Sequence, residues 1–166
     1  MSTKFTKLDD QENVEQSLGQ AMINANQWIS SSLLNLMRMR GHSNLTGAHL
    51  TFFSSLNCGL THASEVARRM GITRQAVYKV TKELQRMDIL RLEEDPSDRR
   101  QKIICMTPLG ETIALDARAS LEKIEQHLSK QIGKTSFESL QASLLKDWGP
   151  IIQSLGDDNL GKIKVS

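Results

Sequence analysis

The chain has 166 residues, of which 39% are hydrophobic, and a formal net charge of +2 at pH 7. Its length is sufficient for one domain with a hydrophobic core, so we expect residues 1–166 to form a single domain. Two cysteines exclude a disulfide framework, the polar residues 1–25 exclude a signal peptide, and no run approaches the roughly 20 apolar residues of a membrane span. These exclusions predict a soluble cytoplasmic protein that makes no membrane contact.

The N-terminal part of the chain predicts two helices. Apolar residues recur every three or four positions between Val14 and Arg40, which is typical of a long amphipathic helix, and Gly41 ends it. A shorter helix is expected from Asn44–Thr46 to Leu56.

Residues 61–87 predict two helices joined by a tight turn, with Thr61 and Thr73 as N-caps and Gly71 in the turn. This layout is typical of a helix-turn-helix, whose second helix enters the major groove of DNA. Positive charge supports the assignment, because residues 61–86 contain six basic and only two acidic side chains. The polar face of the second helix contains Arg74, Gln75, Tyr78, Lys79 and Lys82.

A β-hairpin is expected directly afterwards. Residues 89–93 and 102–107 have the pattern of short strands, and Asp95-Pro96-Ser97-Asp98 between them is rich in turn-forming residues. Arg99 and Arg100 lie at the turn, and guanidinium groups suit phosphate or a narrow minor groove. An ordinary solvated hairpin explains the turn equally well, but its place after a helix-turn-helix favours the wing of a winged helix.

The C-terminal part predicts two further helices. Thr107-Pro108 marks the start of a helix that runs to about Ile132 and ends at Gly133. Thr135-Ser136-Phe137-Glu138 has the pattern of a capping box, which predicts a last helix containing Trp148, Ile151 and Ile152. Pro150 is expected to kink that helix or end it early.

The terminal helices offer more apolar surface than a small three-helix core covers. We therefore expect residues 13–40 and 108–155 to be dimerisation helices that pack against a second copy of the chain. Packing within one chain is the alternative. A two-fold homodimer would place two recognition helices in successive major grooves and read a palindromic site.

This layout resembles the multiple-antibiotic-resistance regulator (MarR) family of bacterial winged-helix transcription factors, from Val14 to about Leu155. The most specific motif is Asp95-Pro96-Ser97-Asp98-Arg99-Arg100 followed by Met106-Thr107-Pro108-Leu109-Gly110. Arg74-Gln75-Ala76-Val77-Tyr78-Lys79 resembles the recognition helix of the family, and residues 60–67 resemble the helix before it. The resemblance implies a mainly α fold with a small β-hairpin wing, in which residues 45–107 form the winged helix-turn-helix between dimerisation helices.

By the same resemblance, the chain would be a homodimeric repressor of transcription that binds a palindromic operator in double-stranded DNA and is relieved by a small-molecule effector. Arg100 would enter the minor groove, Asp98 would orient it, and Arg99 would contact phosphate. The residues expected at the major groove or its rims are Thr73, Arg74, Gln75, Tyr78, Lys79 and Lys82.

Three positions depart from the family pattern. Asp88 stands where glycine is common, although aspartate tolerates the left-handed conformation better than most residues. His62 stands where proline is common, and Pro150 leaves the geometry of the dimer open.

Other functions are less well supported. A redox-responsive regulator would sense through Cys58 or Cys105, although an apolar strand around Cys105 favours an inert thiol. A winged helix used only for protein contact is a further alternative, but such modules often lose the basic face retained here. We expect no metal site, no cofactor and no enzymatic activity, since the sequence has no recognised ligand cluster, phosphate loop or nucleophile motif.

Overall fold

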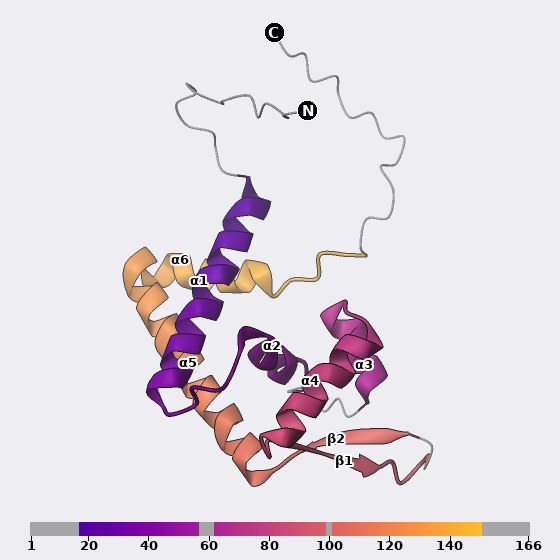
Figure 1. Cartoon of the computed structure of the whole chain (residues 1–166). Helices are drawn as coiled ribbons and strands as arrows, with labels where there is room; N and C mark the ends of the chain where they lie inside the picture. The colour runs from indigo at the N-terminus through magenta and orange to yellow at the C-terminus, as the bar shows by residue number, and fades with distance from the viewer. Residues whose placement is uncertain (1–16, 57–61, 99–100, 151–166) are drawn as a thin grey trace, which may run out of the picture. The chain divides into compact units, whose positions relative to one another are not determined.

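The computed structural model of the chain describes residues 17–56, 62–98 and 101–150. The chain forms two compact units, Met1–Gln126 and His127–Ser166. The described elements are mainly helical with one antiparallel hairpin, which confirms the predicted fold class. In chain order they are α1 (Leu18–Met39), α2 (Gly47–Leu56), α3 (Ala63–Met70), α4 (Arg74–Arg86), β1 (Leu90–Glu94), β2 (Lys102–Met106), α5 (Pro108–Ile132) and α6 (Lys134–Leu144) (Figure 1).

The hydrophobic core of the first unit contains side chains from helices α1 to α5. Met37 of α1, Phe52 of α2, Val66 of α3, and Val77 and Leu84 of α4 are completely buried. Burying a side chain of this kind stabilises the fold by about 1.5–3 kcal/mol. Helices α2, α3 and α4 therefore pack on one another around a shared centre, and the base of the hairpin joins the same core through Ile89, Leu90 and Ile104.

Helix α1 begins at Leu18, where Ser17 is the N-cap and its Oγ accepts the N–H of Gln20 at 3.2 Å. The predicted first turn at residues 14–16 lies outside the described residues. The predicted end is confirmed, because the helix stops at Met39 and Gly41 has φ 94°, a left-handed conformation that favours glycine.

The connection between α1 and α2 is tied to α5 by two ionic hydrogen bonds. Arg40 Nη1 lies 2.8 Å from Asp116 Oδ1, and His42 Nε2 lies 2.7 Å from Asp116 Oδ2. The His42 contact, assisted by the charge of Arg40, holds the pKa of the Asp116 carboxyl below its ordinary value.

The predicted cap of α3 is wrong. The N-cap position belongs to His62 rather than Thr61, and the His62 side chain makes no capping hydrogen bond. Thr61 itself lies outside the described residues. The physical reason is that His62 pairs in a β-bridge with Ile103, which keeps its backbone extended immediately before the helix.

The start of α6 also differs from the prediction. Gly133, with φ 85°, is the N-cap, and the helix begins at Lys134, so Thr135 lies inside the first turn and no capping box forms. A single glycine thus separates α5 from α6, which leaves no residue between them for a side-chain cap.

The end of α6 comes earlier than predicted. The helix stops at Leu144, and Trp148 lies beyond it, with its Nε1 donating to the Ser143 carbonyl at 3.2 Å. The chain turns at Gly149, which has φ 79° and precedes a proline that disfavours helical backbone before it. The prediction that the helix continues through Trp148 is therefore wrong, while Ile151 and Ile152 lie outside the described residues.

The hairpin passes into α5 through a close backbone junction. Thr107 Oγ1 donates to the Asp88 carbonyl at 2.6 Å and accepts the Gly110 N–H at 3.1 Å, so Thr107 caps α5 as predicted. Gly110 lies against Ile89, where a Cβ on residue 110 would stand only 2.2 Å from the Ile89 carbonyl oxygen. Glycine at this position therefore allows the helix to start directly against the end of the α4–β1 connection.

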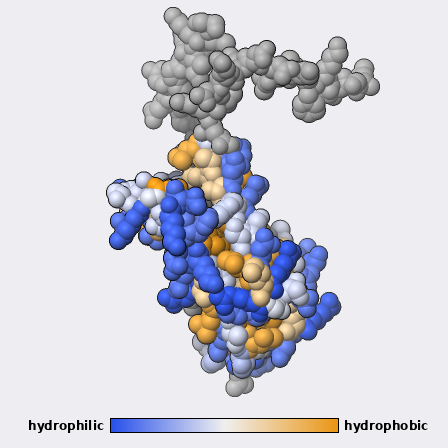
Figure 2. Space-filling model, turned by 90° about the vertical axis from the view of Figure 1, so that its left-hand side faces the viewer, coloured by the Kyte–Doolittle hydropathy of each residue, from blue (hydrophilic) through white to orange (hydrophobic). Residues whose placement is uncertain are grey.

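Both units carry large apolar side chains on their surfaces. Figure 2 shows hydrophobic residues reaching the displayed face between hydrophilic ones. In the first unit the exposed set on α1 and α5 is Leu18, Ile23, Trp28, Met39, Leu109, Leu115 and Leu121. In the second unit it is Ile132, Leu140, Leu144, Leu145 and Trp148.

Within residues 17–56, 62–98 and 101–150, no helix combines the length and apolar content that a membrane span requires.

Candidate nucleic-acid interface

The turn between α3 and α4 fixes the geometry of the helix-turn-helix. Gly71 has φ 63° and ψ 28°, and the Ile72 N–H donates back to the Ala67 carbonyl at 3.1 Å, which closes α3. Thr73 then caps α4 by accepting the Ala76 N–H on its Oγ1 at 3.2 Å. Both the turn glycine and this cap are as predicted, and only residues 71–73 separate the two helices.

Helix α4 has one buried and one exposed face. Val77, Thr81 and Leu84 are buried against the core, and Thr81 Oγ1 donates to the Val77 carbonyl at 2.8 Å. The opposite face is open to solvent, and it contains all the residues that were expected at the major groove or its rims. Its exposed members are Thr73, Arg74, Gln75, Tyr78, Lys79 and Lys82.

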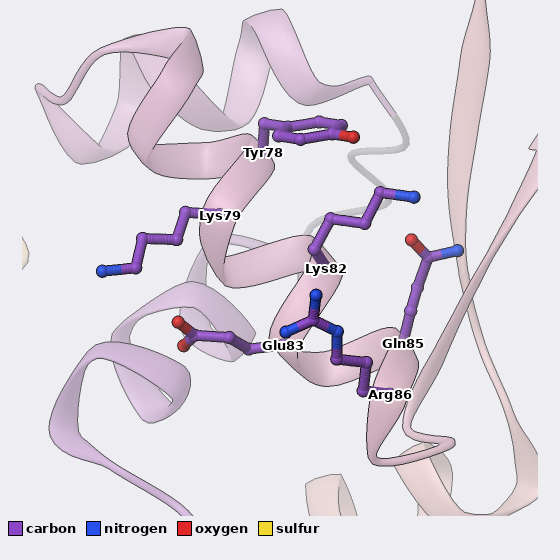
Figure 3. Close-up of a pocket in the computed structure, with 6 residues that line it drawn as sticks. All are labelled: Tyr78, Lys79, Lys82, Glu83, Gln85 and Arg86. Atoms are coloured by element: carbon purple, nitrogen blue, oxygen red, sulfur yellow. The ribbon is translucent and has the colours of Figure 1, made fainter.

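An aromatic–cation contact organises the middle of this face. Lys82 Nζ lies over the Tyr78 ring, 5.5 Å from its centre, while 61% of Tyr78 remains exposed. Figure 3 shows Tyr78, Lys82 and Gln85 on one side of α4, and Lys79 and Glu83 on the other, around a hollow that Arg86 also lines. The helix therefore presents a cationic surface with an accessible aromatic ring on it.

The acidic side chain in this surface has a partner that the sequence did not suggest. Glu83 Oε2 lies 3.2 Å from Nε2 of His49, a buried residue of α2. The Thr46 N–H donates to His49 Nδ1 at 3.3 Å, which leaves Nε2 as the nitrogen that donates to Glu83. The pair spans 34 positions, so no local motif could have revealed it. It ties the outer face of α4 to α2 and fixes the position of the Glu83 carboxylate.

The hairpin pairs in antiparallel register from Leu90 with Met106 to Glu94 with Lys102. It lies beside the helix-turn-helix, since β1 contacts α4 and β2 contacts α3 (Figure 1). Lys102 Nζ and Glu94 Oε1 are 3.8 Å apart at the end where the strands meet the turn. The structure thus places a wing next to the predicted recognition helix.

Asp95 anchors the beginning of the turn. Its Oδ1 accepts the Ser97 N–H at 2.7 Å and the Ser97 hydroxyl at 2.6 Å, and its Oδ2 lies 2.7 Å from His62 Nε2. The two bonds from Ser97, followed by the one from His62, lower the pKa of Asp95 to about 2. Asp95 is therefore a carboxylate at neutral pH and links the turn to the start of α3.

The remaining wing residues are only partly described. Asp98 is half-buried, and it accepts the side-chain amide of Gln101 at 3.0 Å and the Gln101 N–H on its carbonyl at 2.8 Å. Arg99 and Arg100 lie outside the described residues, and so does the predicted bond between Asp98 and Arg100. Those roles stay predictions.

Cys105 has the environment of an unreactive thiol. It lies half-buried in β2 opposite Arg91, where burial and the neighbouring Glu93 carboxylate raise the pKa of its thiol. Cys58 lies outside the described residues. Among the residues that the structure describes, no group of three or more histidine, cysteine or acidic side chains could hold a metal ion.

Part of the sequence matches the model of a known protein family. Residues 43–101 match the model described as the MarR family, and this match spans the helix-turn-helix and β1 and ends directly before β2. No curated protein matches the sequence.

Solved structures match over most of the chain. One is titled "Transcriptional repressor, CouR, bound to a 23-mer DNA duplex", with 21% identity, a TM-score of 0.66, and coverage of 81% of this chain and 96% of that one. Wild-type MarR from E. coli in its apo form has 18% identity, a TM-score of 0.65, and coverage of 78% and 98%. The transcriptional regulator PA4135 has 23% identity, a TM-score of 0.66, and coverage of 81% and 98%. At these identities the matches show a shared fold.

Proposed function

We propose that the chain is a winged-helix transcriptional regulator of the MarR type that binds a specific sequence in double-stranded DNA, and the family match over residues 43–101 supports this proposal. The observation that carries this proposal is the exposed face of α4. Its arginine and glutamine match the hydrogen-bonding edges of guanine and adenine, and its lysines match phosphate. The structural neighbour titled as a transcriptional repressor bound to a 23-mer DNA duplex supports the same conclusion.

The contacts divide by role. Arg74 and Gln75, in the first turn of α4, would read base edges, because the beginning of a recognition helix enters the groove first. Lys79 and Lys82 would contact phosphate and fix the register, and Tyr78 would pack against sugar or base while holding Lys82 above its ring.

The hairpin wing would add contacts with the minor groove and with phosphate. Arg100 would enter the minor groove, Arg99 would lie against phosphate, and Asp98 would orient Arg100. A narrow minor groove attracts arginine because its negative potential is enhanced there.

The functional unit is a homodimer. The exposed apolar residues of α1 and α5, and those of α6 and the residues after it, provide the surface for a second copy. Two-fold symmetry would then require a palindromic operator with half-sites about one helical turn apart. We propose further that the protein is a cytoplasmic repressor that a small-molecule effector relieves.

In vitro selection from a random duplex pool, followed by a salt titration of the selected duplex, tests the proposal. The wild type should enrich a palindrome, and its affinity should fall steeply with salt. Lys79→Ala should weaken binding and reduce the slope of log affinity against log salt by about one. Arg100→Ala should abolish specific binding while sedimentation still shows the dimer.

Lys123→Ala is the matched control, because Lys123 is also an exposed lysine but lies on α5 rather than on the exposed face of α4. It should bind as the wild type does. A wild type that enriches no duplex, or a Lys79→Ala variant that binds no worse than Lys123→Ala, would contradict the proposal.

A further inference from the structure

His62 stands at the junction between the helix-turn-helix and the wing, and it contacts both sides of the hairpin. Its backbone forms an antiparallel bridge with Ile103 in β2. Its Nε2 lies 2.7 Å from Oδ2 of Asp95, the residue that directly follows β1. The residue directly before α3 therefore contacts the beginning of the hairpin turn through its side chain and the returning strand through its backbone.

The contact between His62 and Asp95 is largely shielded from solvent, and further hydrogen bonds fix its geometry. Only 11% of the Asp95 side chain and 29% of the His62 side chain are exposed. The two bonds from Ser97 occupy Asp95 Oδ1 and orient the carboxylate so that Oδ2 faces the imidazole. His62 occupies the N-cap position but makes no capping bond with its side chain, which is directed to the wing instead.

A wing needs such a connection. A two-stranded hairpin is marginally stable by itself in water, so its orientation depends on what it is fastened to. Contacts with a DNA groove tolerate little displacement, because they form only when donor and acceptor stand within about 3 Å.

We propose that His62 and Asp95 are positioning residues that hold the wing in its DNA-binding orientation against the helix-turn-helix. Neither needs to contact DNA itself. The part of this inference that concerns DNA rests on the proposed function, while the part that concerns the placement of the hairpin does not.

Replacing His62 by glutamine or by asparagine distinguishes the positioning role from a role limited to starting α3, because the two amide side chains differ in length. In His62→Gln the amide nitrogen stands about where Nε2 stands in the imidazole, so it can still donate to Asp95. In His62→Asn the same group is one methylene too short. Asparagine is, however, a favoured N-cap residue, so a requirement limited to starting α3 would leave His62→Asn at least as good as the wild type. His62→Leu removes the donor altogether.

The first measurement needs no DNA. Hydrogen exchange of the full-length protein, followed by mass spectrometry, should show faster exchange of the hairpin peptides over residues 90–106 in His62→Asn and His62→Leu. The hairpin of His62→Gln should exchange as in the wild type. Thermal unfolding verifies that each variant is folded, and if His62→Leu does not fold, the Asn and Gln variants decide the question by themselves.

The second measurement uses the duplex selected with the wild type. His62→Asn and His62→Leu should bind it about tenfold more weakly, as expected for the loss of one hydrogen bond to a charged group, and His62→Gln should stay within about twofold of the wild type. Three results would overturn the inference: an Asn variant that matches the wild type, a Gln variant as impaired as the Leu variant, or a faster-exchanging hairpin without weaker binding. If the wild type selects no duplex, the proposed function falls, and hydrogen exchange still decides whether the pair places the wing.

Discussion

Replacing Gly110 by alanine should destabilise the fold, because α5 starts closer to the preceding backbone than a side chain allows. A Cβ on residue 110 would lie 2.2 Å from the Ile89 carbonyl oxygen and 3.3 Å from the Ile89 carbonyl carbon, whereas ordinary contact begins at 3.4 Å. The obstacle is backbone, so no side-chain rotation relieves it. The first turn of α5 must therefore move away from the end of the α4–β1 connection.

The size of the effect follows from three contributions. Forcing an extra group into a packed site costs about 1–3 kcal/mol. The displacement also strains the bonds of Thr107 to the Asp88 carbonyl at 2.6 Å and to the Ile89 carbonyl at 3.1 Å, and weakening one of them costs about 1 kcal/mol. The higher helix propensity of alanine offsets at most about 1 kcal/mol of this destabilisation. We expect Gly110→Ala to lower the free energy of unfolding by about 1–3 kcal/mol.

Urea denaturation at a fixed protein concentration measures this difference, and Gly19→Ala is its matched control. Gly19 is also in the first turn of its helix, but a Cβ there would meet nothing closer than Ser17 Oγ at 4.0 Å. The control should be unchanged or more stable by up to about 1 kcal/mol. If Gly110→Ala proves as stable as Gly19→Ala, the reasoning about the close junction is refuted.

Two further predictions concern titratable groups. Because the folded-state pKa of Asp95 is lowered to about 2, its contribution to stability is complete above the ordinary carboxyl pKa of 3.8 and is lost as the pH falls toward 2. The stability difference between wild type and Asp95→Asn in urea titrations should therefore shrink between pH 5 and pH 2.5, and an unchanged difference would contradict the assignment. Cys105, whose thiol pKa is raised by burial and by Glu93, should react with iodoacetamide at pH 8 more slowly than glutathione does, as followed by peptide mass spectrometry. Faster alkylation of Cys105 would instead revive the redox-responsive alternative.

Local sequence signals predicted the fold well where a physical constraint acts within a few residues. Gly71 and Thr73 were identified because a left-handed turn and a helix N-cap each favour particular side chains, and both are in place. Asp88, which departs from the family pattern, adopts φ 57°, in keeping with the tolerance of aspartate for this conformation. The predicted exposed face of α4 follows from helical periodicity in the same way.

The predictions failed where tertiary contacts override a local preference. Thr61 and the Thr135–Glu138 pattern are good capping sequences, yet a β-bridge at His62 and a single glycine at Gly133 set the true helix starts. The role of Gly110 depends on the position of Ile89, and the partner of Glu83 is a histidine in another helix. Such contacts are invisible in one sequence, because nothing local marks which distant residues meet.

Three histidine–carboxylate pairs among the described residues also bear on how the first unit unfolds. They join residues separated by 74, 34 and 33 positions, namely His42 with Asp116, His49 with Glu83, and His62 with Asp95. None can form until the segments on both sides have docked, and none survives if one segment detaches. Partial opening of a single helix or of the hairpin thus forfeits a polar contact as well as apolar burial, which favours all-or-none unfolding over stepwise fraying.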